Sequence, residues 1–347
     1  MDRSTSVAWF QCWRLAGQAL LCLLPALPMA QAGATTYAFT TSGTWADGGA
    51  AATDINRSGT AVGYQFDNAT AVSTAFVSAG GVKTYLAGPA GSTSVDLFGI
   101  SDSGLMVGNY ANTLEDDGTG NLFPGPTRMF SLFNGVYTDL AIPGLTSPYL
   151  RAISGNGRWL VGYTIDGLGA AHGFAFDSQP GGALTLFGGT ATTVVAAGVN
   201  NLGVVVGYDR TFVPGVGQVG PGWTVDLLSG QRTEFQVAGS QRSGPRDITD
   251  GGVISGYYFT SPGPAVAHGF TGLGGNFEFF DVPGASQTFI GAGNDLGALA
   301  GFYLDADGNQ GAFVAVPVPE PAAAWLLLAG LSGLAVHRRR NARSVQS

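Results

Sequence analysis

Two histidines in similar contexts are the first candidates for chemistry in this chain of 347 residues. His172 and His268 each open a His-Gly-Phe segment at the start of a short apolar run. An imidazole is able to ligate a metal or to act as a general base near neutral pH. Neither histidine belongs to an H-E-x-x-H or G-x-S-x-G motif, which would place it beside its chemical partners. We therefore interpret both as structural residues of a repeated strand.

Acidic turns offer a second kind of chemistry, the binding of calcium. Asp305, Asp307 and Asn309 alternate around Gly308, and residues 115–118 have a similar composition. Calcium loops need such alternating oxygen ligands, a turn glycine and a distal bidentate glutamate. Both segments lack that glutamate, and hairpin turns explain them equally well. The sequence thus predicts no cofactor, with calcium at Asp305, Asp307 and Asn309 as the alternative.

Two further patterns have both a chemical and a structural interpretation. Residues 215–220 match the dinucleotide-binding pattern G-x-G-x-x-G, but prolines flank them and no helical pattern follows, so we predict a glycine-rich loop. Trp45, Trp159 and Trp223 would suit stacking on sugar rings or filling the space between sheets. No acids can be recognised as a glycosidase pair, because turn aspartates occur throughout the chain.

Short β-strands are the elements that would position these residues. Glycine accounts for 56 residues, and runs of Val, Thr, Phe and Tyr are broken by Gly, Asn, Asp and Pro, which predicts an all-β fold. Residues 33–316 contain 21 acidic residues against eight arginines and one lysine, a formal net charge of −12. Such a domain is not expected to bind nucleic acid or anionic lipid.

A sixfold internal repeat predicts the architecture. The copies resemble Ile-Asn-x-x-Gly-x-x-Val-Gly-Tyr, and their second glycines are 45, 54, 45, 49 and 45 residues apart. These glycines are Gly63, Gly108, Gly162, Gly207, Gly256 and Gly301. The period lies in the range of propeller blades, so the sequence predicts one six-bladed β-propeller over residues 33–316. A linear β-solenoid and two β-sandwiches are the alternatives.

Each part of the repeat has an expected position. The first glycine, such as Gly59, suits a tight turn with positive φ. The second glycine lies within a strand and marks a close approach of another backbone, which we expect at the crowded axis. A His-Gly-Phe-type strand and a strand ending at Pro-Gly complete a meander of three or four strands. The last repeat lacks its final strand, and residues 37–40 are expected to supply it and close the ring.

The N-terminal residues predict export. Residues 1–32 have a charged start, an apolar stretch and the cleavage motif Ala30-Gln31-Ala32 before Gly33, as in a secretory signal peptide. Both cysteines of the chain, Cys12 and Cys22, lie in this segment. The mature protein is therefore expected to hold its fold without disulfides or thiolate metal sites.

Residues 317–347 combine a polar motif, an apolar run and a basic cluster. Val318-Pro319-Glu320-Pro321 precedes the uncharged residues 322–336, and the tail 337–347 contains Arg338, Arg339 and Arg340. A helix rising 1.5 Å per residue needs about twenty residues to cross a bilayer core, so this segment is short. The arrangement resembles the PEP-CTERM sorting signal, which implies transient membrane insertion and an exosortase-type membrane enzyme as partner. A permanent anchor and a buried core helix are the alternatives.

The repeats also resemble those of the HAF family, named for His-Ala-Phe, which occur in exported bacterial proteins with this kind of tail. Only His172 and His268 keep the histidine, and the resemblance implies no established activity. We expect an exported, non-enzymatic cell-surface or extracellular-matrix protein that interacts with exopolysaccharide or envelope, membrane-anchored until its tail is processed. The alternative is a lectin or carbohydrate-active enzyme with a site at the propeller axis. Thr113–Pro126 and Arg210–Pro221 break the repeat most and are the expected places for specialised loops.

Overall fold

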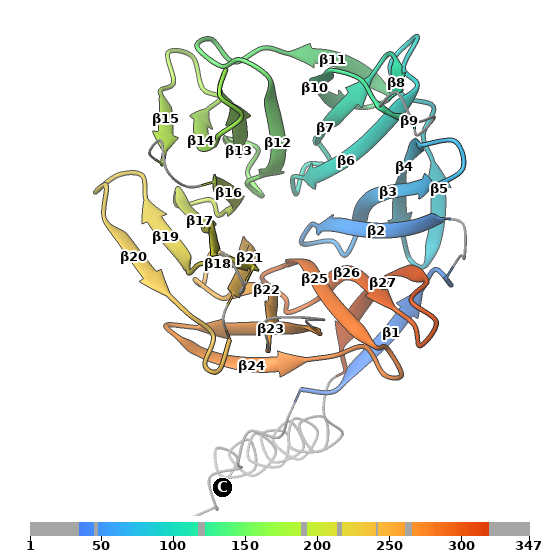
Figure 1. The fold of residues 1–347 in the computed structure, drawn as a ribbon, viewed down its shortest axis with the longest axis vertical. Helices are drawn as coiled ribbons and strands as arrows, with labels where there is room; N and C mark the ends of the chain where they lie inside the picture. The colour runs from blue at the N-terminus through green and yellow to red at the C-terminus, as the bar shows by residue number, and fades with distance from the viewer. Residues whose placement is uncertain are drawn as a thin grey trace, which may run out of the picture. The chain divides into compact units, whose positions relative to one another are not determined.

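A computed structural model describes residues 35–44, 48–116, 122–188, 193–213, 217–240, 242–260 and 266–318. All the regular elements in these ranges are β-strands (Figure 1). Six antiparallel sheets surround a central axis, each contacts the next, and the last contacts the first. This arrangement confirms the predicted six-bladed β-propeller and excludes the linear solenoid and the paired sandwiches.

Each blade is a meander of four strands that starts at the axis and moves outward (Figure 1). Blade 1 contains β2 (Gly48–Ile55), β3 (Ala61–Asp67), β4 (Val72–Ala79) and β5 (Val82–Tyr85). Blade 2 contains β6 (Ser94–Ile100), β7 (Met106–Ala111), β10 (Thr127–Phe133) and β11 (Val136–Leu140), with the extra hairpin β8 (Leu114–Asp116) and β9 (Leu122–Pro124). Blade 3 contains β12 (Pro148–Ile153), β13 (Trp159–Ile165), β14 (Ala171–Asp177) and β15 (Leu184–Phe187).

The second half of the ring repeats this order. Blade 4 contains β16 (Thr193–Val199), β17 (Val204–Val213), β19 (Gly222–Asp226) and β20 (Arg232–Phe235), with β18 (Gly217–Val219) paired to β17. Blade 5 contains β21 (Arg242–Ile248), β22 (Ile254–Phe259), β23 (Ala267–Leu273) and β24 (Asn276–Phe280). Blade 6 contains β25 (Gln287–Gly293), β26 (Leu299–Leu304), β27 (Gln310–Pro317) and β1 (Tyr37–Thr41).

The first strand of the chain closes the ring. β1 pairs antiparallel with β27, with Tyr37 opposite Pro317 and Thr41 opposite Phe313. The ring of Tyr37 lies 5.1 Å from that of Phe280 in blade 5, so β1 also packs against the neighbouring blade. The prediction that residues 37–40 complete the last blade is confirmed. Closure covers a sheet edge that would otherwise be free to pair with other chains.

In every blade the second glycine of the repeat lies opposite an aromatic residue of the third strand. The pairs are Gly63 with Phe76, Gly108 with Phe130, Gly162 with Phe174, Gly207 with Trp223, Gly256 with Phe270 and Gly301 with Phe313. All six rings are at most 1% exposed. Glycine leaves room for the ring, and the ring fills the space between blades.

The backbone that approaches these glycines belongs to the inner strand of the same blade. A Cβ atom built on Gly162 would lie 2.0 Å from the carbonyl oxygen of Tyr149 and 3.0 Å from the ring of Phe174. Our expectation that the close approach occurs at the axis was therefore wrong. The reason is that the inner strand lies between the second strand and the axis.

The turns after the inner strands tie the blades to one another. Gly59 and Gly203 have φ values of 81° and 80°, which confirms the predicted positive φ of the first repeat glycine. The Asn56 side chain accepts hydrogen bonds from backbone N–H groups of its own turn and donates to the carbonyl oxygen of Ser101 in blade 2 at 3.2 Å. Asn294 of blade 6 donates to the carbonyl oxygen of Asn56 at 2.8 Å. The repeated turn residue thus joins neighbouring blades around the axis.

Several predictions concern residues outside the described ranges. These are the signal peptide 1–32 with Ala30, Ala32 and Gly33, the sorting residues Pro319, Glu320, Pro321, Arg338, Arg339 and Arg340, the segment 322–336, and Trp45. Val318 directly follows β27, and its N–H donates to the carbonyl oxygen of Thr36 at 2.8 Å. Within the described ranges, no helix has the length and apolar character to span a membrane.

Candidate functional site

A β-bulge in the inner strand of every blade shapes the centre of the ring. The strand register shifts at the same step in all six inner strands. A bulge leaves one residue unpaired and re-aims its side chain. The unpaired residues are Thr53, Phe98, Arg151, Ala197, Arg246 and Gly291. All six line one cavity at the axis, which we name the axial cavity.

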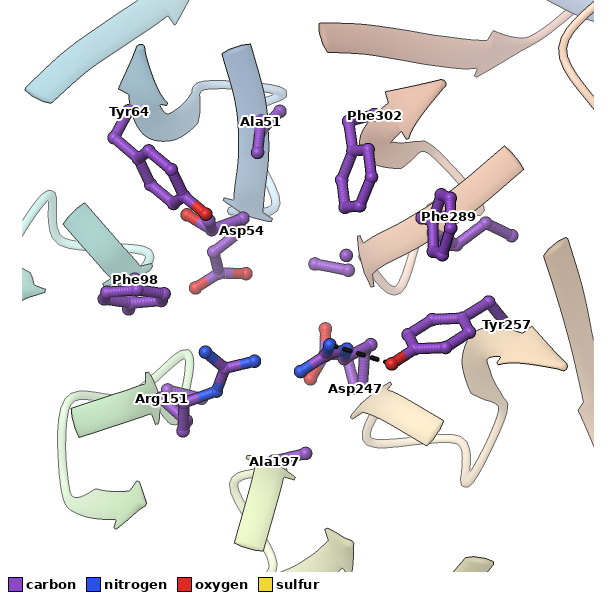
Figure 2. Close-up of a pocket in the computed structure, with 17 residues that line it drawn as sticks. Ala51, Asp54, Tyr64, Phe98, Arg151, Ala197, Asp247, Tyr257, Phe289 and Phe302 are labelled. Carbon is purple, nitrogen blue, oxygen red and sulfur yellow. Dashed lines mark hydrogen bonds between the residues drawn. The ribbon is translucent and has the colours of Figure 1, made fainter. Parts of the chain in front are cut away.

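The axial cavity is small and of mixed polarity. Its volume is about 80 Å³. Because about 10–15 Å³ on this measure suffices for one water, the cavity has room for a few waters or one small ionic group. Figure 2 shows Tyr64, Arg151, Tyr257 and Phe302 pointing into it from different blades. A larger ligand would therefore insert one group and keep its remainder outside.

Two arginines bring positive charge to the axial cavity. The guanidinium carbon of Arg151 lies 5.1 Å from the centre of the Phe98 ring. Arg246 donates a hydrogen bond from Nη2 to the Tyr257 hydroxyl at 3.1 Å (Figure 2). Its Nη1 is buried and has no hydrogen-bond partner among the described residues. Within the described ranges neither arginine forms an ion pair with a carboxylate.

The phenol of Tyr257 senses the combined field of four arginines. Burial alone would raise the pKa of Tyr257, but nearby positive charges outweigh it and hold that pKa below its ordinary value. In decreasing order of effect these charges belong to Arg246, Arg210, Arg151 and Arg242. Half of the eight arginines in residues 33–316 thus act on one phenol. This phenol therefore lies in a locally positive field, although the cavity is also lined by Asp54 and Asp247.

Two carboxylates at the cavity are held by backbone hydrogen bonds. Asp54 accepts from the N–H groups of Ile55 and of Ile100 in the next blade, both at 2.7 Å. Asp247 accepts from Ile248 at 2.8 Å and from Gly293 in the next blade at 3.3 Å. Each of the two aspartates directly follows a bulge residue. They therefore hold the bulge in place and join neighbouring blades.

The same carboxylates are unusually weak acids. Burial raises the pKa of Asp247 to about 6. Burial, followed by the charge of Asp247, raises the pKa of Asp54 well above its usual range. Burial also raises the pKa of Asp96 on β6 to about 6. As the pH falls through about 6, Asp247 and Asp96 lose their negative charge, while the arginines stay positively charged.

The two predicted histidines lie away from this cavity. His172 and His268 belong to the third strands β14 and β23, and neither lines the axial cavity. Nε2 of His172 lies 3.0 Å from Oδ2 of Asp166, and Nδ1 of His268 lies 2.8 Å from Oδ2 of Asp281. Each pair joins two parts of a single blade, which fits the structural interpretation.

The candidate calcium ligands form a hydrogen-bonded turn. Oδ1 of Asp305 accepts from the N–H groups of Asp307 and Asn309, both at 2.9 Å. Its Oδ2 accepts from the hydroxyl of Thr44 at 2.8 Å and from the side chain of Asn309 at 3.2 Å. No cluster of three or more potential metal ligands occurs within the described ranges. The calcium alternative therefore has no structural support.

The irregular segments form hairpins that extend blades 2 and 4. Strand β8 pairs with β9 within Thr113–Pro126, and β17 pairs with β18 within Arg210–Pro221. Residues 217–219 of the glycine-rich motif thus belong to a hairpin, and the described residues around them lack the βαβ context of a dinucleotide site. The described residues of the two segments do not line the axial cavity.

The described tryptophans fill space between sheets. Trp223 is fully buried with its ring 5.4 Å from that of Phe187 in blade 3, and Trp159 is only 8% exposed. Of the two interpretations that the sequence left open, packing therefore holds for both, and sugar stacking does not.

Sequence reasoning missed Arg151, Arg246, Tyr64 and Tyr257. A signal was present at the position three residues before the turn residue, for example Thr53 before Asn56. Across the copies this position reads Thr, Phe, Arg, Ala, Arg and Gly, while the residues around it repeat. A variable position inside a regular repeat is where a repeat protein is able to place a ligand contact without disturbing the framework.

The closed ring and its central cavity define a six-bladed β-propeller with a small cavity at its axis. No protein-family model matches the sequence, and no curated protein matches it significantly. Among solved structures, a TolB-like protein from Agrobacterium tumefaciens is 14% identical with a TM-score of 0.46, covering 72% of this chain and 79% of its own.

Two other solved structures are similar to the same extent. The β-propeller domain of the Trilobed protease from Pyrococcus furiosus is 8% identical with a TM-score of 0.43, covering 74% of this chain and 79% of its own. The lectin SapL1, solved with alpha methyl fucoside, is 14% identical with a TM-score of 0.47, covering 75% and 89%. The similarity concerns the architecture of the chain.

Proposed function

We propose that this protein is an exported, non-enzymatic propeller of the cell surface or extracellular matrix that binds an extracellular polysaccharide at its axial cavity. The observation that carries the proposal is the ring of six bulge residues. Every blade places one variable residue at the same cavity, a side chain in five blades and Gly291 in blade 6, and aromatic and charged groups meet there. Such a concave site of mixed polarity, on a rigid scaffold, is typical of ligand recognition.

The two ends of the chain support export and sorting. Residues 1–32 carry the features of a signal peptide, and the PEP-CTERM-like residues follow directly after β27, the last strand of the chain's described part. In this proposal an exosortase-type enzyme processes the tail after transient membrane insertion. The protein recovered outside the cell should then lack Arg338, Arg339 and Arg340 by intact-mass analysis. An intact basic tail on the exported protein would replace sorting by a permanent anchor.

The carboxylates favour binding over catalysis. A glycosidase needs one carboxyl as a general acid and another as a base or nucleophile, both free to reach the substrate. In Asp54 and Asp247 both oxygens of each carboxylate already accept backbone N–H groups. The two carboxylates therefore hold the backbone around the cavity in place.

Calorimetric titration of the full-length protein with exopolysaccharide from the producing cells tests the binding proposal. Saturable binding, together with a rise in the unfolding temperature, is expected because a ligand of the native state stabilises it. A matched titration uses Phe302→Ala, which removes one ring from the cavity. Absence of any heat or thermal shift with the wild-type protein would refute a polysaccharide-binding function.

A further inference from the structure

We infer that the axial cavity recognises a carboxylate group, so that the bound polysaccharide contains acidic, uronic-acid-type sugars. This inference rests on the proposed function and specifies the chemistry of its ligand. It is carried by three separate observations at the cavity: the distribution of charge, an unpartnered guanidinium nitrogen, and the size of the space.

The distribution of charge is the first observation. Residues 33–316 carry a net charge of −12 with only nine basic residues. Arg151 and Arg246 line the cavity, and Arg210 and Arg242 also act on the phenol of Tyr257 in its wall. A cleft that gathers one sign of charge concentrates ligands of the opposite sign. In a chain that repels anions elsewhere, this placement favours an anionic group at the axis.

The hydrogen bonding of Arg246 is the second observation. Its terminal nitrogen Nη2 is bonded to Tyr257, and the other terminal nitrogen, Nη1, is buried without a partner in the described part of the chain. A buried polar group without a partner is costly, so it calls for a ligand that satisfies it. The planar guanidinium matches a carboxylate, which is able to accept two parallel hydrogen bonds.

The aspartates at the cavity do not neutralise its arginines by forming ion pairs with them. Arg151 and Arg246 form no ion pair, although Asp54 and Asp247 line the same cavity. The reason is geometric, since backbone N–H groups hold both carboxylates in the bulges. The arginines are therefore charged and half-buried beside acids that do not bond to them. An external carboxylate is able to do so.

The size of the cavity is the third observation. A volume of about 80 Å³ admits a carboxylate and a few waters, but less than a saccharide chain. A uronic acid carries its carboxylate at the edge of the sugar ring. It would insert that group between the arginines, among aromatic lining residues such as Tyr64, and leave the sugar ring outside.

The test titrates the full-length protein with three forms of the exopolysaccharide: native, carboxyl-reduced and desulfated. Carboxyl reduction converts each carboxylic acid to a neutral primary alcohol and keeps the chain. We expect the reduced form to bind at least about tenfold more weakly, since hydrogen bonds to a charged group are lost. The desulfated form should bind like the native one.

Variants assign the effect to the cavity. Arg246→Gln and Arg151→Gln should each weaken binding of the native polymer about tenfold or more and reduce its preference over the reduced form. Arg246→Lys, which keeps the charge and loses the fork, should fall between the wild type and Arg246→Gln. Arg128→Gln is the matched control, because Arg128 is 63% exposed on β10. Circular dichroism and unfolding temperatures establish that each variant is folded.

The outcomes separate the inference from the function on which it rests. Equal binding of native and reduced polymer would overturn the carboxylate inference and keep a neutral saccharide site. Loss of binding on desulfation, but not on carboxyl reduction, would identify the recognised anion as sulfate and would also overturn the carboxylate inference. Equal loss in Arg128→Gln would move recognition away from the axis. No binding of any form by the wild-type protein would remove the proposed function itself.

Discussion

Replacing Gly162 by alanine tests the packing rule that is repeated in every blade. A Cβ atom at this position would lie 2.0 Å from the backbone oxygen of Tyr149 and 3.0 Å from the Phe174 ring. Real Cβ atoms essentially never come so close to an oxygen, so one of the groups must move. The oxygen belongs to the bulged inner strand, and the ring is fully buried. Neither is able to move without separating the strands or opening the interface between blades.

The expected loss of stability follows from these contacts. Overpacking a well-filled core costs about 1–3 kcal/mol, and the upper end applies here because a backbone atom is displaced. With an unfolding entropy of about 2.1 cal/mol/K per residue and roughly 280 residues, a loss of about 3 kcal/mol lowers the unfolding temperature by roughly 5 °C. Scanning calorimetry or thermal circular dichroism of the full-length protein measures this shift.

Gly167→Ala is the matched control in the same blade. A Cβ atom there meets nothing within 4 Å, and the change is expected to stay within about 0.5 kcal/mol. Equal unfolding temperatures for the two variants would refute the claim that the repeat glycine is required by the ring opposite it. A large loss in both would point instead to a general cost of replacing glycine in blade 3.

Three further outcomes are expected. Phe174→Ala should lower the free energy of unfolding by about 3–5 kcal/mol in urea titrations, because it empties the space beside Gly162; a loss below about 1 kcal/mol would contradict its place in the core. Deleting residues 37–41 should lower the unfolding temperature and increase light scattering, because β27 becomes an open edge; an unchanged monomer would contradict closure by β1. Binding of the carboxylated polymer should tighten as the pH falls from 7.5 to 5.5, because Asp54 and Asp247 have raised pKa values, that of Asp247 being about 6, and lose their negative charge as they are protonated. Asp247→Asn should weaken this pH dependence. Tighter binding at pH 7.5 than at pH 5.5 would contradict the argument.

The architecture could be predicted because local sterics repeat in the sequence. Gly59 and its counterparts take positive φ at a turn, and Gly63 and its counterparts make room for an aromatic ring. Both requirements act over a few residues, so they leave the same letters in each copy. The closing strand could be predicted for a similar reason, since the last copy lacks a strand that residues 37–40 resemble.

The axial cavity could not be predicted in the same way. Arg151 and Arg246 meet only when blades 3 and 5 take their places around the axis, and nothing local links them. Their direction depends on a bulge, which is a property of strand pairing and leaves no mark on the alternation of apolar and polar residues. The histidines attracted attention because their chemistry is familiar, although Asp166 and Asp281 engage them within single blades.

The way in which β1 closes the ring also determines how the domain responds to force. Both chain ends leave the ring side by side, since Val318 donates a hydrogen bond to Thr36. A pull between the two ends would unzip β1 from β27 one pair at a time, starting at Tyr37 and Pro317. A pull on the C-terminal end alone acts on β27, which is held by β26 on one side and β1 on the other. In a propeller tethered by its C-terminus, the pulling force therefore acts on a strand that is hydrogen-bonded on both sides. The hydrogen bonds of β27 with β26 and with β1 would together resist that force.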